Sequence, residues 1–176
     1  MAQLPDIAVE VTDLAKSYGF VVALKSVNFR IESGRYFVLL GPSGGGKTTL
    51  LRLIGGFIRP TRGRILLHGR DVSDLPPNKR PTSMVFQSFA LFPHMTVAKN
   101  VGYGLRIRKL PISEVLERVG DMLEMVGLTG LGDRMPHELS GGQQQRVQLA
   151  RSLVLETDIL LLDEPLASLD AKLHKI

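Results

Sequence analysis

Three separated segments of the chain carry residue types that could do chemistry. The first combines glycines with a lysine, the second combines a serine and two glycines with a glutamine, and the third ends in two carboxylates. The three segments are residues 41–48 (GPSGGGKT), residues 139–143 (LSGGQ) and residues 160–164 (LLLDE). Residues without a Cβ let successive backbone N–H groups turn inward around an anion, and a lysine that follows can neutralise phosphate charge. The first segment therefore predicts a phosphate-binding loop.

This loop has the spacing of a nucleotide triphosphate cradle. Its residues are Gly41, Pro42, Ser43, Gly44, Gly45, Gly46, Lys47, Thr48 and Thr49. We expect Lys47 to bridge the β- and γ-phosphates and the Thr48 hydroxyl to hold Mg²⁺. The alternative is a flexible glycine turn, which is disfavoured because a strand pattern precedes the loop and a helix pattern follows it.

Two adjacent carboxylates, Asp163 and Glu164, follow the apolar run at residues 159–162. We expect Asp163 to orient Mg²⁺ or its water, and Glu164 to polarise the attacking water as a general base. The alternative is an acidic pair that caps a buried strand at the surface.

The segment Ser140, Gly141, Gly142 and Gln143 opens a helix pattern. A hydroxyl and closely approachable amides at a helix N-terminus make a second anion site. If the segment stood by itself, a routine serine N-cap would be the favoured interpretation.

The elements that must position these residues follow from hydrophobic periodicity. Residues 8–11 and 27–31 alternate, which predicts half-exposed antiparallel strands. Residues 36–40 are apolar throughout, which predicts a central strand buried on both faces that runs into the glycine loop and a helix at 47–54. Residues 64–68, 83–86 and 159–162 are the remaining predicted strands, and the last should lie parallel to the central one, so that both end at the same sheet edge.

The region between the strands is predicted to be helical. Thr96 suits an N-cap for a helix at 97–105, and residues 114–126 carry apolar residues at helical spacing. Together with the helix after Ser140, they predict a small helical subdomain inserted at about residues 96–150.

Composition narrows the class of protein. A chain of 176 residues is the size of one domain, and the absence of cysteine excludes a disulfide framework, a thiolate metal site and a thiol nucleophile. Residues 1–6 do not resemble a signal peptide and no apolar run is long enough to span a membrane, so we expect a cytoplasmic protein. The net charge of +5 is read mainly as solvated surface, and no nucleic-acid partner is expected.

The three segments resemble the Walker A, signature and Walker B motifs of the ATP-binding cassette (ABC) ATPases. The resemblance covers residues 8–173, and the signature is its most specific part. It implies an α/β fold of the P-loop NTPase class, with a mixed-sheet core, N-terminal antiparallel strands and a helical insert, all within one domain at residues 1–176. It also implies ATP and Mg²⁺ as ligands and ATP hydrolysis as the activity.

The resemblance adds further assignments to the site. Tyr18 matches the aromatic residue that stacks on adenine, and Gln87 matches a residue that contacts Mg²⁺ or the attacking water. Residues 168–170 match a loop at the dimer interface. The expected catalytic residues are Glu164, Gln87 and Lys47, and the expected metal-binding residues are Thr48, Gln87 and Asp163.

Partners are implied in the same way. In this family two ATPase subunits pair head to tail, so that Ser140 and Gly142 would meet the γ-phosphate held by the partner's Lys47. Transmembrane permease subunits would dock on the apolar residues after Gln87, which are Phe89, Leu91, Phe92 and Met95. The expected location is peripheral, at the cytoplasmic face of the inner or plasma membrane. Residues 80–97 resemble the importer cassettes for polyamines, iron(III), sulfate and sugars, with polyamine cassettes closest in texture.

The chain departs from the family pattern at its end. The expected switch histidine is absent, because His174 follows Asp170 too closely, and no C-terminal accessory domain follows. We therefore expect a C-terminally truncated cassette. Two alternatives stay open, namely a soluble cassette without a transport role and a catalytically impaired nucleotide-binding fragment.

Overall fold

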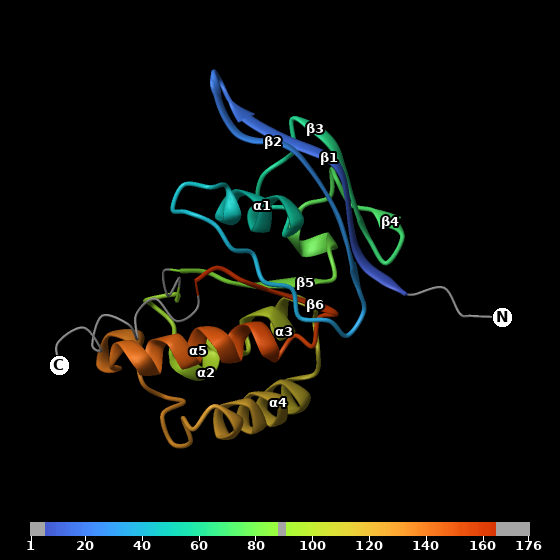
Figure 1. The fold of residues 1–176 in the computed structure, drawn as a ribbon. Helices are drawn as coiled ribbons and strands as arrows, with labels where there is room; N and C mark the ends of the chain where they lie inside the picture. The colour runs from blue at the N-terminus through green and yellow to red at the C-terminus, as the bar shows by residue number, and fades with distance from the viewer. Residues whose placement is uncertain (1–5, 88–90, 165–176) are drawn as a thin grey trace. The chain divides into compact units, whose positions relative to one another are not determined.

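The structure, a computed structural model, describes residues 6–87 and 91–164. The chain divides into two compact units, Met1–Thr82 and Ser83–Ile176. Figure 1 shows the elements of both units in chain order.

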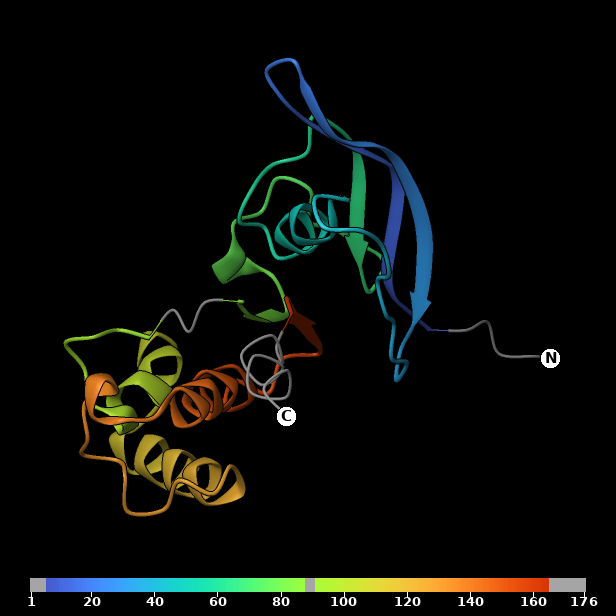
Figure 2. The same ribbon diagram turned by 60° about the vertical axis from the view of Figure 1, so that its left-hand side comes forward.

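The first unit contains a four-stranded antiparallel sheet in the order β2-β1-β3-β4. Its strands are β1 (Ile7–Tyr18), β2 (Val21–Glu32), β3 (Arg62–Leu67) and β4 (Arg70–Asp71). Helix α1 (Lys47–Ile54) lies beside one face of this sheet in both ribbon views (Figures 1 and 2). Apolar side chains of β1, β3 and α1 are buried, among them Val11, Ile65 and Leu53.

The predicted antiparallel strands are confirmed, but they are longer than expected. The alternating residues at 8–11 and 27–31 are parts of β1 and β2, which have 12 residues each. The turn between them includes Gly19 in a left-handed conformation with φ 57°. The helix predicted at 47–54 is also confirmed with those bounds.

A buried arginine fixes the C-terminal end of α1. Arg80, which is 6% exposed, donates through Nη1 to the carbonyl oxygens of Leu53 and Ile54, at 2.8 Å each. It donates through Nε to the carbonyl oxygen of Leu75 at 2.8 Å. Burial lowers the pKa of Arg80 from its ordinary value, and nearby acidic groups oppose this shift. The guanidinium thus supplies a donor to two carbonyls at the end of the helix, one of which, that of Leu53, also accepts from the Gly56 amide at 3.2 Å.

The glycine turn after α1 is built around this arginine. Gly56 has φ 77°, and a Cβ at this position would lie 2.5 Å from Arg80 Nε. Glycine is therefore required both by the backbone conformation and by the contact.

The predicted central strand at residues 36–40 is absent from the structure. Neither sheet includes these residues, and Tyr36 and Leu40 are almost fully exposed. A strand buried on both faces needs hydrogen-bonded neighbours on each side, and β1 to β4 bond to one another instead. The prediction was wrong because an apolar composition indicates that a segment is buried but does not identify the strand with which it pairs.

The second unit combines a two-stranded sheet with helices. Strand β5 (Thr82–Val85), which begins at the unit boundary, pairs with β6 (Ile159–Leu162). The helices are α2 (Val97–Val101), α3 (Tyr103–Ile107), α4 (Ile112–Met125) and α5 (Gly141–Leu153). Short 3₁₀ turns cover Pro77–Lys79, in the first unit, and Pro136–Glu138. Apolar residues of α2 to α5 share a core that includes Val97, Leu105, Val119 and Val147.

The helix predictions for this unit are largely confirmed. Thr96 caps α2 by accepting a hydrogen bond from the Lys99 amide at 3.3 Å. The helix predicted at 97–105 is divided at Gly102, where a Cβ would lie 3.1 Å from methyl groups of Val115 and Val119. The predicted strand at 159–162 exists but is only half buried. The assignment of this region as an inserted subdomain of one domain stays a prediction.

In the part of the chain that the structure describes, no helix is long and apolar enough to cross a membrane.

Candidate functional site

The predicted phosphate loop lies in the first unit and leads directly into α1, which begins at Lys47. Gly44 and Gly46 have φ of 77° and 83°, a region that residues with a Cβ rarely adopt. A Cβ on Gly46 would also lie 2.8 Å from the carbonyl oxygen of Ala23. The loop conformation therefore depends on glycine, as its sequence pattern predicts.

The charge at the loop comes from Lys47. Its Nζ donates to the carbonyl oxygens of Gly41 and Pro42, at 2.8 Å each. These bonds fold the ammonium back over the loop, so its charge lies at the N-terminus of α1. No acidic residue occupies the first turn of this helix, so the helix dipole adds to the positive potential. This arrangement suits the charge of a phosphate group. Thr48 and Thr49 lie in the same first turn.

The predicted carboxylates lie at the end of β6 in the second unit. Asp163 is 4% exposed, and its amide donates to the Val85 carbonyl oxygen at 3.0 Å. Glu164, the next residue, is exposed and has φ 48°. The Gln87 side chain donates from Nε2 to Glu164 Oε2 at 2.9 Å. The structure thus brings together two predicted catalytic residues that lie 77 positions apart in the sequence.

The serine of the second segment is a helix cap. Ser140 Oγ accepts a hydrogen bond from the Gln143 amide at 3.3 Å, and Gln143 Oε1 accepts one from the Ser140 amide at 2.9 Å. This reciprocal pair forms a capping box at the start of α5. The N-cap alternative is therefore confirmed. It leaves the serine O–H able to donate to an anion, because a hydroxyl both donates and accepts. Gly141 and Gly142 occupy the first two positions of α5.

Tyr18 is the last residue of β1 and is 49% exposed. Lys16 Nζ lies 5.0 Å from the centroid of its ring and donates to the Arg59 carbonyl oxygen at 2.8 Å. A cation over one face orients the ring. A half-exposed aromatic ring of this kind can stack on a base.

The apolar segment after Gln87 is described in part. Phe92 packs against the ring of Tyr103 with a centroid separation of 4.6 Å, and the Arg151 guanidinium lies 5.2 Å from the Phe92 centroid. Burial lowers the pKa of Arg151 from its ordinary value. Leu91 packs against the helical core. Phe89, residues 168–170 and His174 lie outside the described residues, so the predictions for them are untested.

Sequence reasoning missed Asn100, which is fully buried. Its Oδ1 accepts from the Phe92 amide at 2.8 Å, and its Nδ2 donates to the carbonyl oxygens of Met95 at 2.9 Å and Thr96 at 3.1 Å. Asn100 therefore fixes the loop at residues 92–96. The sequence offered one signal for this residue, namely a carboxamide side chain on the apolar side of the helix predicted at 97–105.

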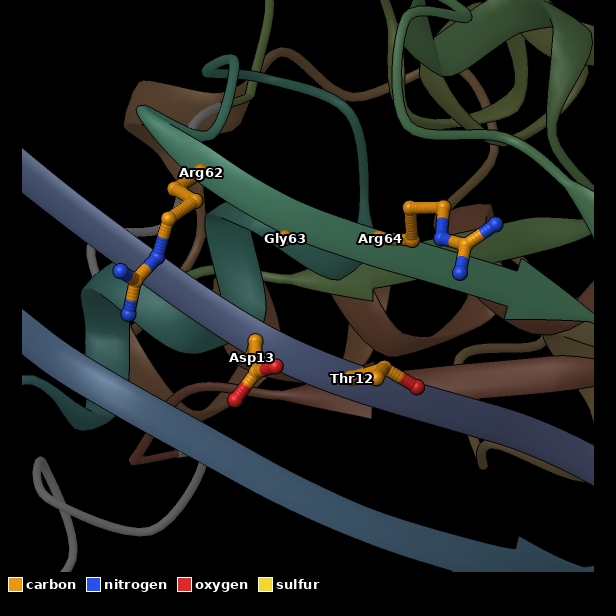
Figure 3. A pocket seen from close by; sticks show the side chains of 5 residues that line it. All are labelled: Thr12, Asp13, Arg62, Gly63 and Arg64. Carbon is orange, nitrogen blue, oxygen red and sulfur yellow. The ribbon is translucent and has the colours of Figure 1, made fainter.

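The first unit also contains a shallow pocket of about 390 Å³ that no prediction anticipated (Figure 3). It is lined by Thr12, Asp13, Arg62, Gly63 and Arg64, where β1 and β3 change register. None of the residues predicted to bind nucleotide lines it. The chemistry of the phosphate loop and of the carboxylates is therefore the better guide to the site.

Possible metal ligands are spread along the chain. Among the described residues, no group of three or more His, Asp or Glu side chains is arranged to hold a metal ion. Asp163 and Thr48 nevertheless offer the oxygen donors that Mg²⁺ prefers, and Mg²⁺ commonly takes one or two carboxylates together with substrate phosphates. As donors, the Asp163 carboxylate and the Thr48 hydroxyl are each of the kind that Mg²⁺ takes, one in each unit.

Comparison with known proteins gives consistent results. The profile of a family described as "ABC transporter" matches residues 24–167. The spermidine/putrescine import ATP-binding protein PotA of Acidothermus cellulolyticus is 55% identical over 177 residues, covering 98% of this chain and 46% of that protein. The Fe(3+) ions import ATP-binding protein FbpC of Brucella abortus is 55% identical over 163 residues, covering 93% of this chain and 46% of that protein. The chain thus spans about half the length of the curated relatives it matches.

Solved structures show the same fold. The dimeric structure of a post-hydrolysis state of an ATP-binding cassette bound to ADP and Pi matches with a TM-score of 0.84 and 34% identity. The match covers 93% of this chain and 77% of that chain. The structure of a dimeric bacterial ABC transporter cassette matches with a TM-score of 0.84 and 32% identity, over 95% of this chain and 78% of that one. The predicted α/β fold of the P-loop NTPase class is thereby confirmed.

Proposed function

The chain belongs to the ABC transporter family of ATPase domains, and from this premise we propose that it binds and hydrolyses ATP to power a solute importer. The observation that best supports hydrolysis is the 2.9 Å hydrogen bond between Gln87 and Glu164, beside the buried Asp163. It joins a carboxylate that can accept a proton to an amide that can orient it.

The phosphate loop would bind the nucleotide. Backbone amides at residues 41–48 would surround the β-phosphate, and Lys47 would exchange its bonds to loop carbonyls for bonds to phosphate oxygens. Tyr18 would stack on the adenine. Thr48 and Asp163 would hold Mg²⁺, which neutralises charge that develops on the phosphates.

Glu164 would act on water. Its carboxylate would accept a proton as the water attacks the γ-phosphate, which makes it the general base. The Gln87 amide donates to one carboxylate oxygen and so leaves the other available for the water. Gln87 would also report the state of the nucleotide to the loop that follows it.

Two further partners complete the proposal. A second ATPase subunit would place Ser140 and Gly142 against the γ-phosphate, and the similar solved cassettes are described as dimeric. Permease subunits would contact the segment that contains Leu91, Phe92 and Met95, which places the protein at the cytoplasmic face of a membrane. The names of the relatives support a polyamine or ferric iron as cargo.

The proposal is tested on the full-length protein that carries this chain. Glu164→Gln should retain Mg²⁺-dependent ATP binding in equilibrium dialysis and lower turnover by about a hundredfold or more, because the proton acceptor is lost. Lys47→Ala should abolish binding. Glu156→Gln is the matched control, since Glu156 is also exposed and also has φ 48°. Turnover that survives Glu164→Gln, or binding that survives Lys47→Ala, would contradict the proposal.

Transport itself needs a separate measurement. The protein should stimulate solute uptake in vesicles that contain its permease, and only when ATP is present on the cytoplasmic side. ATP hydrolysis without any stimulated uptake of polyamine or ferric iron would leave the ATPase assignment intact and remove the assigned cargo.

A further inference from the structure

Strand β5 has one sheet neighbour among the described residues, and that neighbour is β6. The Val85 carbonyl oxygen points to β6, where it accepts from the Asp163 amide at 3.0 Å. Successive carbonyls of an extended chain point to opposite sides, so those of Met84 in β5 and of Phe86, the second residue after it, are expected to point away from β6. These two carbonyls therefore face the edge of β5 that lacks a paired strand.

Helix α5 supplies the missing donors along this edge. Gln148 Nε2 donates to the Phe86 carbonyl oxygen at 2.9 Å, and Ser152 Oγ donates to the Met84 carbonyl oxygen at 3.3 Å. Four residues of an α-helix rise about 6 Å, and two residues of a strand rise about 6.6 Å. The spacing of the two donors thus matches the spacing of the two acceptors, with the helix running against the strand. Two side chains of α5 take the place of a neighbouring strand.

The burial of Gln148 shows that its amide is structurally important. The residue is 1% exposed. A buried carboxamide that loses its hydrogen bond destabilises the folded chain, whereas an apolar side chain at such a position has no hydrogen bond to lose. The Phe86 carbonyl that Gln148 binds belongs to the peptide group that leads into Gln87. Its nitrogen is the backbone nitrogen of Gln87.

We infer that Gln148 is a positioning residue for Gln87. By fixing the Phe86–Gln87 peptide it sets the origin of the Gln87 side chain, and hence the 2.9 Å bond that orients the Glu164 carboxylate. The same helix carries Ser140 at its N-terminus. A shift of α5 is therefore transmitted to Gln87 through Gln148. The inference rests on the proposed ATPase function.

The test compares Gln148→Leu with Ser152→Ala in the full-length protein. Leucine keeps much of the side-chain volume but cannot donate, so kcat for ATP should fall about tenfold while KM stays within about twofold, because the bond that is lost goes to the Phe86 carbonyl and not to a residue proposed to bind nucleotide. Ser152→Ala also removes a side-chain hydrogen bond to a backbone carbonyl, but its acceptor, Met84, is two residues farther from Gln87 along the chain than Phe86 is. It should change kcat by less than about twofold.

A double-mutant cycle separates positioning from a loss of general packing. In a Gln87→Ala background, Gln148→Leu should lower kcat no further, because the group that it positions is already gone. An equal loss in both backgrounds, or an unchanged kcat in the single variant, would overturn the inference.

Amide hydrogen exchange provides a readout that does not depend on ATP turnover. Without nucleotide, the segment at residues 85–87 should exchange faster in Gln148→Leu than in the wild type. Unchanged exchange would overturn the inference even if the variant lost activity. If the wild type turns over no ATP, the proposed function fails, and exchange alone decides whether Gln148 holds this segment.

Discussion

Gly46 shows how a single residue can determine the phosphate loop. Its backbone is left-handed, with φ 83°, and the space that a Cβ would need is taken by Ala23 and Leu24. Gly44 has a similar φ of 77°, but in the part of the chain that the structure describes nothing lies within 4 Å of the position that its Cβ would take. Both glycines therefore need a left-handed backbone, but only at Gly46 do neighbouring atoms also occupy the space of a Cβ.

This difference gives a prediction. Gly46→Ala should lower the free energy of unfolding by about 2–4 kcal/mol, because backbone strain and steric overlap add. Gly44→Ala should cost only about 1–2 kcal/mol, since strain acts alone. Urea denaturation of both variants measures the difference. Equal destabilisation would show that β2 moves aside and that the contact is soft.

The residues that local spacing identified were the easiest to predict. The loop glycines and Lys47 sit in a continuous motif, so the sequence itself specifies their arrangement. The contact between Gln87 and Glu164 could not be derived from spacing, because it depends on how β5 pairs with β6. Asn100 and Gln148 were not predicted, because the sequence alone does not distinguish a buried carboxamide in a helix from a solvent-exposed one.

At the scale of elements, Arg80 determines how α1 ends. Its guanidinium binds the last carbonyls of the helix and the Leu75 carbonyl, so one side chain replaces several solvent contacts. The start of this helix carries the phosphate loop. Fixing its end therefore supports the site from the opposite side.

Arg80→Met tests this role. Methionine keeps the buried aliphatic volume but removes the arginine donor from the carbonyls of Leu53, Ile54 and Leu75, of which that of Leu53 keeps a second donor in the Gly56 amide. The free energy of unfolding should therefore fall by about 3 kcal/mol or more. Arg30→Met is the matched control, because Arg30 is exposed and pairs with Glu10 on a strand. It should cost less than about 1 kcal/mol. Thermal or urea unfolding measures both variants. Similar losses of unfolding free energy in the two would contradict the role of Arg80.

Helices and strands were predicted correctly where the hydrophobic periodicity of the segment was sufficient. The prediction failed where the structure depends on which strand the segment pairs with. Helix α1 has its predicted bounds because the glycine loop ends at Gly46 and the paired glycines Gly55 and Gly56 follow Ile54. Residues 36–40 carry a strong strand pattern, yet hydrogen bonding in the sheet goes to other segments. A strand is defined by its neighbour, and composition does not identify that neighbour.

At the scale of the whole molecule, family membership supports an assembly of two chains. The first two residues of α5, Gly141 and Gly142, are exposed, and a Cβ on Gly142 would meet nothing within 4 Å among the described residues. A surface position with free space that follows a capping serine is suited to close approach by a second copy.

Size-exclusion chromatography with ATP tests the assembly. Glu164→Gln in the full-length protein should elute as a dimer with ATP and as a monomer without it, because bound nucleotide persists when turnover is blocked. Adding Gly142→Gln should prevent the dimer while preserving the fold. Gly120→Gln, at an exposed helical position with equally free space, is the control and should leave the dimer intact. A dimer that forms with Gln at position 142 would exclude this face.

The pairing of Gly56 with Arg80 has an evolutionary consequence. Position 56 needs a left-handed residue, which in practice means glycine or asparagine, and the arginine leaves no room for the asparagine side chain. The two positions should therefore covary among homologous sequences. Glycine should persist at 56 wherever the arginine does, and asparagine there would need both a shorter residue at 80 and a shift of the Leu75 carbonyl oxygen, which lies 2.9 Å from the Cβ position.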